Sequence, residues 1–333
     1  MKFLCAVFVA AVAVLPVHVA RAQPKVVASI KPIHSLVAAV MQGVGESGIV
    51  VDGAASPHAY SLKPSQARLL EQAQVIFWVG PGLETFLEKP ISSLAERADV
   101  VELSEAPGLV RLALREGGAF EPHGGHDEHD AHDEHETHAQ DDHEHGSGHD
   151  HEKAEESGHD AFDSHLWLDP ENAKAFVQVI EARLAAADPA NADAYAANAK
   201  TVTQRLEALS ADITELVRPV KDRPYIVFHD AYHYFENRFD LNAAGSITIN
   251  PETPPGAGRV AEMHAKVTAL GATCVFSEPQ FEPKLIAVVT ADSQARPGVL
   301  DPLGASLANG PDLYFTMMRA LATAVRACLS PAG

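Results

Sequence analysis

Residues 191–217 read NADAYAANAKTVTQRLEALSADITELV, an uninterrupted helical pattern that divides the chain. The stretch contains neither Gly nor Pro, and Pro219 follows it. Apolar side chains recur at helical spacing at Val202, Leu206, Leu209, Ile213 and Leu216. A helix of this length would extend for about 40 Å, at 1.5 Å per residue. We therefore expect a stiff spine between two halves of the chain, the alternative being an ordinary packed helix.

Short apolar runs alternate with helical patterns on both sides of this stretch. Before it, strands are predicted at Val26 to Ile30, Ile49 to Val51, Val75 to Val79 and Val100 to Leu103. After it, strands are predicted at Tyr225 to Phe228, Ala243 to Ile247, Cys274 to Phe276 and Val299 to Leu300. Such alternation is typical of parallel sheets. We predict an α/β fold of two lobes, each with a parallel-type sheet flanked by helices, joined by the long rigid helix.

The predicted organisation begins with a signal peptide at 1–22. Lys2 precedes an apolar run from Phe3 to Leu15, and Ala20-Arg21-Ala22 has the small-x-small pattern that signal peptidase recognises. We expect the mature chain to begin at Gln23 and to be a soluble periplasmic protein, because no later stretch approaches the roughly 20 apolar residues of a membrane anchor.

The mature chain is too long for one ordinary core. Its predicted parts are an amino-terminal lobe at 23–170, a helical linker at 171–219 that contains the helix 191–217, and a carboxyl-terminal lobe at 220–333.

The chain is strongly acidic, with a formal net charge of -20. This charge argues against nucleic acid or an anionic membrane surface as a partner and is compatible with a cationic ligand. Residues 121–160 hold 15 acidic side chains against one Lys, so most of the acidity lies in one segment. The segment is almost wholly His, Asp, Glu, Gly and Ser, and it cannot bury enough apolar surface to fold. We predict a disordered insertion in the amino-terminal lobe.

Eleven of the 18 histidines fall in this insertion. They are His123, His126, His129, His132, His135, His138, His143, His145, His149, His151 and His159. Neutral imidazole is a good ligand for Zn²⁺, Ni²⁺ and Cu²⁺, and composition does not choose among them. The insertion is therefore predicted to gather metal ions loosely. The alternative, a solvated acidic spacer, would not need the imidazoles.

Outside the insertion, four metal-ligating side chains occupy related positions. His58, His229 and Asp301 lie at or just beyond the ends of predicted strands, and His165 comes directly after the insertion. In parallel sheets, ligand sites form beyond the carboxyl ends of the strands. We expect these residues to share one crevice, although each alone would more often be a surface or hydrogen-bonded core residue.

Five segments together resemble the ZnuA-type zinc-binding proteins of ABC importers. They are Gly53 to Gln66, His165-Leu166-Trp167-Leu168-Asp169-Pro170, Phe228-His229-Asp230-Ala231-Tyr232, Cys274 to Phe281, and Leu300-Asp301-Pro302-Leu303-Gly304. They fall in family order over essentially the whole mature chain. The resemblance implies two lobes joined by a long helix, Zn²⁺ cargo held between them, and delivery to a membrane permease. We further expect a monomer.

Position by position, the resemblance implies that His58, His165 and His229 are the zinc ligands. Asp301 matches the acidic ligand of manganese-binding relatives. Some zinc-binding members carry a Glu just before the first ligand, where this chain has Pro57. Asp301 or a water molecule is therefore expected to complete the site. Three imidazoles with one oxygen favour tetrahedral Zn²⁺, although Cu²⁺ and Ni²⁺ would also bind.

Two cysteines remain once Cys5 is removed with the signal peptide. In an oxidising compartment, Cys274 and Cys328 are interpreted as one disulfide rather than a metal site, and two buried free thiols are the alternative. The resemblance also implies this pairing.

A zinc hydrolase is the main rival function, because three histidines can leave a fourth position for an activated water. It would need a general base and a substrate pocket, which no segment supplies, and we expect no enzyme. An adhesin would require neither the crevice histidines nor the insertion. His34, His233 and His264 are interpreted as structural or surface residues. The sequence GVGESG at 43–48 is a turn, because it follows a helix and precedes a strand.

Overall fold

The computed structural model describes residues 23–115, 120, 162–248, 251, 255–270, 274–281 and 284–331. The predicted signal peptide and the whole predicted insertion at 121–160 lie outside the described residues. The boundaries of the lobes and the linker stay predictions.

The first half of the chain forms a sheet of four parallel strands in the order β2-β1-β3-β4. Its elements are β1 (Val26–Ile30), α1 (Lys31–Val40), β2 (Ser47–Val51), α2 (Pro64–Gln72), β3 (Val75–Trp78), α3 (Thr85–Leu94), β4 (Asp99–Glu102) and a 3₁₀ turn η1 (Leu103–Glu105). All residues of β1 and β3 are buried, as expected for parallel strands that are covered on both faces. A Pro lies in the first turn of α1 and of α2.

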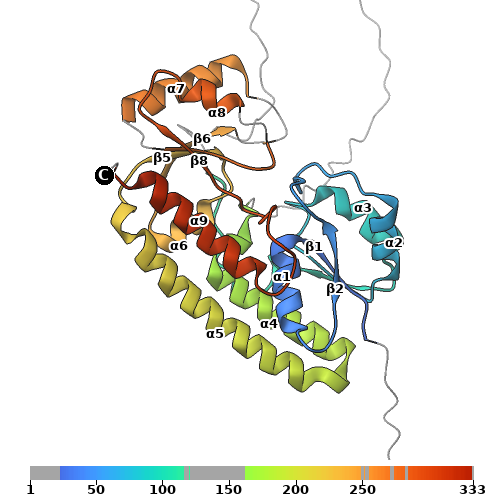
Figure 1. Cartoon of the computed structure of the whole chain (residues 1–333). Coiled ribbons are helices and arrows are strands. Elements are labelled where there is room, and N and C mark those ends of the chain that lie inside the picture. Colours follow the sequence, from blue (N-terminus) through green and yellow to red (C-terminus); the bar gives the residue numbers. More distant parts are fainter. Residues whose placement is uncertain are drawn as a thin grey trace, which may run out of the picture.

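The second half repeats this topology with the parallel order β6-β5-β7-β8. Its elements are β5 (Tyr225–His229), α6 (His233–Phe239), β6 (Ala243–Thr248), α7 (Ala257–Leu270), β7 (Cys274–Ser277), α8 (Lys284–Val289) and β8 (Arg296–Val299). Helices α7 and α8 cover one face of this sheet, and their buried side chains form a small apolar cluster with the strands (Figure 1).

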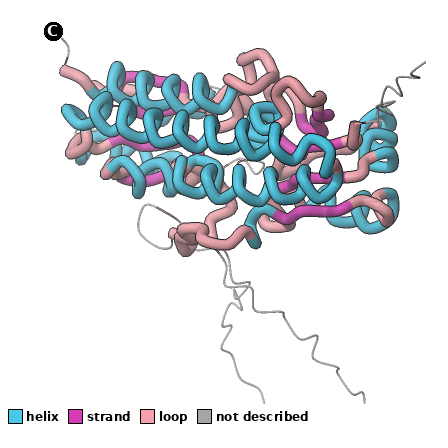
Figure 2. The backbone as a smooth tube through the Cα atoms, turned by 90° about the horizontal axis from the view of Figure 1, so that it is seen from below, coloured by secondary structure: helices cyan, strands magenta, loops and turns pink. Residues whose placement is uncertain are grey.

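Three long helices connect the two sheets. They are α4 (Pro170–Ala187), α5 (Ala192–Val217) and α9 (Leu313–Leu329), and the 3₁₀ turns η2 (Leu166–Leu168), η3 (Pro189–Asn191) and η4 (Arg218–Val220) flank α4 and α5. Helix α5 packs against both α4 and α9, and the long helices lie alongside one another when the molecule is seen from below (Figure 2). The long helix predicted over 191–217 is therefore confirmed.

The apolar stripe of α5 faces the core as predicted. Val202, Leu206, Leu209 and Ile213 are buried, whereas Val217 rather than Leu216 completes the buried stripe. The two α/β lobes with parallel sheets are likewise confirmed.

The last strand differs from its prediction. We expected a strand at Val299 to Leu300, but β8 spans Arg296–Val299 and pairs with β7 at the edge of the sheet. Pro297 and Gly298 weaken the strand signal in the sequence, because Pro cannot donate a hydrogen bond to the sheet and Gly has no side chain to pack. An edge position tolerates both residues.

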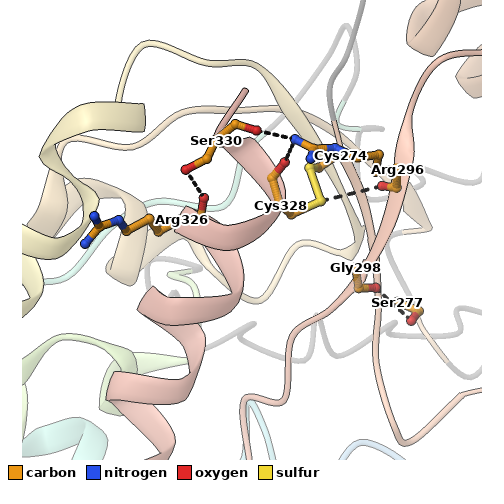
Figure 3. The surroundings of a disulfide bond; sticks show 7 residues. All are labelled: Cys274, Ser277, Arg296, Gly298, Arg326, Cys328 and Ser330. Carbon is orange, nitrogen blue, oxygen red and sulfur yellow. Dashed lines mark hydrogen bonds between the residues drawn. A yellow bond between two sulfur atoms is a disulfide. The ribbon is translucent and has the colours of Figure 1, made fainter. Parts of the chain in front are cut away.

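A disulfide joins Cys274, the first residue of β7, to Cys328 near the end of α9. The predicted pairing is confirmed. Arg296 donates hydrogen bonds to the carbonyl oxygens of Cys328 and Ser330, so the start of β8 also holds the end of α9 (Figure 3).

Among the described residues, the structure contains no helix with the length and apolar character needed to cross a membrane.

Candidate metal centre

Both sheets contribute a histidine to one crevice. His58 lies in the loop after β2 of the first sheet, and His229 is the last residue of β5 in the second. His165 immediately precedes η2 and lies between them. His229 and His165 are buried, at 4% and 6% exposure, and His58 is partly exposed. The three predicted histidines thus meet although more than a hundred residues of sequence separate the first from the second.

The Nε2 atoms of these histidines converge. Nε2 of His165 lies 3.3 Å from Nε2 of His58 and 3.3 Å from Nε2 of His229. Within the described part of the chain, these three residues form the group whose ligand atoms all lie within 4.8 Å of one another and could hold a metal ion.

Two buried carboxylates orient two of the imidazoles. Nδ1 of His165 lies 2.7 Å from Oδ1 of Asp163, and Nδ1 of His229 lies 2.6 Å from Oε1 of Glu278. Asp163 Oδ1 also accepts a hydrogen bond from the backbone N–H of His165. An ionised carboxylate can only accept a hydrogen bond, so Nδ1 of His165 and Nδ1 of His229 carry the hydrogen and the Nε2 atom of each ring presents its lone pair. The crevice therefore presents lone pairs that face one another and attract a cation.

The surroundings shift the pKa values of two of the histidines in opposite directions. Burial lowers the pKa of His58 well below its usual value, and nearby His165 and His229 lower it further. Burial also opposes protonation of His229, but the charge and hydrogen bond of Glu278, with Asp230 and Asp163, outweigh it and raise the pKa of His229. His58 is thus ready to bind a metal, whereas a proton competes with the metal at His229.

Asp301 lies beyond the end of β8, as predicted, but its carboxylate is engaged in its own turn. Oδ1 accepts from the backbone N–H of Leu303, at 3.2 Å, and Oδ2 accepts from that of Ala305, at 2.6 Å. The side-chain amide of Gln280 also donates to Oδ1, at 3.2 Å. Asp301 is not a member of the group of three histidines whose ligand atoms lie close together.

The remaining walls of the crevice are mostly apolar. Besides the three histidines and Glu278, the lining residues are Ser56, Pro57, Trp167, Gln280, Phe281, Pro302 and Leu303. Pro57 thus lines the pocket at the position where it departs from the family pattern. Oε1 of Gln280 is buried without a hydrogen-bond partner among the described residues.

Sequence reasoning missed the roles of Asp163 and Glu278, although Glu278 lies in a segment that carried the resemblance and Asp163 lies just before another. Asp163 stands two residues before His165, a spacing that lets one carboxylate reach both the backbone and the ring of the histidine. Glu278 follows β7, the strand beside β5, so its place at the carboxyl edge next to His229 could have been inferred.

The histidines that we set aside lie elsewhere. His34 is buried in α1 and bonds the carbonyl of Ser47, and His264 in α7 bonds the carbonyl of Ala291. His233 begins α6, half-buried beside Tyr234. The segment at 43–48 begins in the turn after α1 and ends in the first two residues of β2.

Comparisons with known proteins agree with this arrangement. A family model described as "Zinc-uptake complex component A periplasmic" matches residues 26–328. The high-affinity zinc uptake system protein ZnuA of Brucella suis biovar 1 (strain 1330) is 55% identical over 305 residues, covering 92% of this chain and 91% of that protein. The protein of the same name from Yersinia pestis is 34% identical and covers 92% of each chain.

Solved structures share the fold. The periplasmic zinc-binding protein TroA of Treponema pallidum superimposes with a TM-score of 0.73 at 21% identity, covering 93% of this chain and all of that one. A crystal structure of ZnuA gives a TM-score of 0.71 at 22% identity, with coverage of 93% and 100%.

Proposed function

This chain belongs to the family of periplasmic zinc-uptake components, and from that premise we propose that it captures Zn²⁺ in the crevice between its two sheets. His58, His165 and His229 are the proposed ligands. Asp163 and Glu278 are proposed to keep two of these rings in the orientation that a metal ion requires.

The spacing of the Nε2 atoms carries this proposal. Two nitrogens that each lie 2.0–2.1 Å from a tetrahedral Zn²⁺ are about 3.3 Å apart. The observed separations of His165 Nε2 from His58 Nε2 and from His229 Nε2 are both 3.3 Å. The donor set of neutral imidazoles also suits zinc better than the harder manganese or magnesium ions.

Asp301 or a water molecule is the proposed fourth ligand. The hydrogen bonds of Asp301 within its own turn favour water, and the unpartnered Oε1 of Gln280 could accept a hydrogen bond from that water. Asp301→Asn should distinguish the two. If the carboxylate binds zinc directly, the variant loses affinity and the absorption spectrum of bound Co²⁺ changes. If water is the ligand, the spectrum stays that of the unaltered chain.

Competition titration with a zinc-chelating indicator tests the function itself. We expect one tight site in the wild-type chain and its loss in His229→Ala. His264→Ala serves as the matched control, because this histidine of α7 bonds the carbonyl of Ala291 and does not line the crevice, so its loss should leave the tight site intact. Retention of the tight site in His229→Ala would contradict the proposed site.

We propose that the crevice binds zinc without turning over a substrate. The two carboxylates nearest the histidines are both committed to imidazole Nδ1 atoms, which supports the absence of a general base. The family is one of solute-binding transport proteins. Zinc-dependent hydrolysis of an ester, peptide or phosphate substrate that His229→Ala abolishes would overturn this part of the proposal.

Delivery to the permease of a zinc ABC importer, by a periplasmic monomer, is proposed from the family. It predicts that the chain restores growth in low zinc to a bacterium that lacks its own zinc-binding component, and that His229→Ala does not. The export signal is tested by the amino terminus of the mature protein, which should be Gln23.

The insertion is proposed to gather additional ions. Deleting residues 124–158 should lower the number of zinc ions bound per chain and leave the one tight crevice site. Loss of the tight site in an isothermal titration would show that the insertion, rather than the crevice, holds it.

A further inference from the structure

An arginine beside the crevice connects the segment that follows the first sheet to the second sheet. Arg115 donates from Nε to both carboxylate oxygens of Asp230, each at 3.0 Å, and its NH2 group also contacts that carboxylate. Its NH1 group donates to Oε2 of Glu236 at 2.6 Å. Asp230 immediately follows His229, and Glu236 lies in α6.

The same segment is hydrogen-bonded to the stretch of residues that leads into His165. Ala113 forms an antiparallel bridge with Phe162, and the backbone N–H of Asp163 donates to the carbonyl of Leu112 at 2.9 Å. Asp163 in turn holds the ring of His165. A continuous series of contacts therefore runs from His165 through Asp163 and the bridge between Ala113 and Phe162 to the segment that carries Arg115.

Arg115 completes the connection from His165 to His229. The N–H of Leu112 also donates to the hydroxyl of Tyr234 in α6, at 3.1 Å, so the segment is anchored to the second half at two points. Of these contacts, only the Arg115–Asp230 pair reaches the residue next to a proposed ligand.

We propose that Arg115 is a positioning residue for the metal centre, which fixes the distance between His165 and His229 before the ion arrives. This inference rests on the proposed function and identifies a residue outside the ligand set on which zinc affinity depends. Three imidazoles contributed by distant segments bind tightly only if their geometry is preformed, because otherwise binding must supply the ordering entropy.

The energetics of the pair favour such a role. Arg115 and Asp230 have side-chain exposures of 16% and 18%, and Glu236 has 2%, so water screens the contact poorly. Two carboxylates share one guanidinium, whose planar fork holds them in a fixed geometry. A Lys in its place would keep the charge but not the fork.

The test compares Arg115→Met and Arg115→Lys with the wild-type chain. Zinc dissociation constants and the absorption spectrum of bound Co²⁺ are measured, together with the melting temperature of the metal-free protein. We expect Arg115→Met to weaken zinc binding about tenfold and to alter the Co²⁺ spectrum. A tenfold loss is at the lower end of the losses of metal affinity seen when residues that hold metal ligands in place are replaced. Arg115→Lys should recover part of the affinity.

Arg205→Met is the matched control. Arg115 lies over the ring of Phe120, and Arg205 in α5 likewise pairs with a carboxylate, Asp312, and lies over the ring of Phe315. The partners of Arg205 belong to the start of α9 rather than to the crevice. We expect it to lower the melting temperature without changing the affinity or the spectrum. Asp230→Asn replaces Arg115→Met if that variant does not fold, and it should weaken zinc binding similarly.

A lower melting temperature with unchanged zinc affinity and an unchanged Co²⁺ spectrum in Arg115→Met would assign the residue a purely structural role and overturn the proposal. This outcome is distinct from failure of the proposed function, in which the wild-type chain itself would lack the tight site that His229→Ala removes.

Discussion

Among single residues, Glu278 sets how zinc binding at His229 depends on pH. Its side chain is 1% exposed and raises the pKa of His229 against the effect of burial. Protons should therefore compete with zinc at His229 as the pH falls through this raised value, and affinity should be greatest above it.

We predict that Glu278→Gln weakens zinc binding about tenfold at neutral pH, because the imidazole loses the partner that makes it a stronger base. The pKa of His229 should fall, so the further loss of affinity on acidification should be smaller than in the wild type. Competition titrations from about pH 7.5 to about pH 5.5 measure both effects. They are best made on the chain that lacks 124–158, with the exposed Glu215→Gln as control. Parallel pH profiles would contradict the prediction.

Another buried carboxyl, that of Glu84, belongs to the first half of the chain rather than to the crevice. Glu84 is fully buried just before α3, and burial raises its pKa to about 7 despite hydrogen bonds from the backbone N–H groups of Val79 and Gly80. The neutral form suits the fold. The contribution of protonated Glu84 to the free energy of unfolding is complete below 4.5, the pKa of this carboxyl in the unfolded chain, and is lost as the pH rises through about 7.

We predict that Glu84→Gln, which cannot ionise, is more stable than the wild type above pH 7, by up to ~3 kcal/mol. The two proteins should converge in stability near pH 4.5, the unfolded-state value. Denaturant unfolding at several pH values measures the difference. Glu88 is exposed in α3, and Glu88→Gln should show no such pH dependence. If Glu84→Gln were equally more stable than the wild type at low and at high pH, ionisation of Glu84 would not be the cause.

At the scale of elements, β8 depends on the absence of a side chain at one position. A Cβ on Gly298 would lie 2.5 Å from Cε1 and 2.6 Å from Cδ1 of Phe276 in the neighbouring strand. The Phe276 ring is fully buried and packs edge-on against Tyr225, so it has little room to move. The close approach of β7 and β8 therefore requires Gly.

Gly298→Ala should destabilise the protein by about 1–3 kcal/mol, the usual cost of overpacking. Gly258→Ala in α7 is the control, because a Cβ there meets no atom within 4 Å and Ala favours a helix. Denaturant midpoints of the two variants should move in opposite directions. A Gly298→Ala variant as stable as the wild type would mean that Phe276 can move aside.

For the whole molecule, the two sheets share their core. One cluster of buried apolar residues includes β1 and β3 of the first sheet, the long helices, and residues of β5 and β7 in the second. The smaller cluster is confined to the face under α7 and α8. Two lobes that are joined through a continuous core should not unfold separately.

We predict a single calorimetric transition in the metal-free chain, with equal calorimetric and van't Hoff enthalpies. Zinc should move the transition upward, by a stabilisation of ~4 kcal/mol when free zinc exceeds the dissociation constant a thousandfold. His229→Ala should keep the single transition but lose most of this shift. Two resolved transitions in the wild type would mean that the shared core does not couple the lobes.

Features that depend on residues close together in the sequence could be predicted, whereas features that depend on distant residues could not. The long helix, seven of the eight strands in the described part of the chain and the turn before β2 could be predicted, because their signals are periodicity and local backbone preference. The strand at Arg296–Val299 could not, since only its edge position and the packing of Phe276 make Pro297 and Gly298 acceptable. The three histidines could be nominated because each flanks a strand end or a recognisable segment.

The sequence by itself determined the α/β class, the two-sheet plan and which imidazoles could bind a metal, since these depend on neighbouring residues and on composition. Only the tertiary structure decided that Glu278 orients His229 and that Arg115 contacts Asp230. Glu278 reaches His229 across 49 residues of sequence, and Arg115 reaches Asp230 across 115. The first pairing depends on β5 and β7 lying side by side in one sheet, and the second on how the segment after the first sheet packs against the second half of the chain. The long helix from which the fold could be inferred is also one of the three long helices that connect the two sheets.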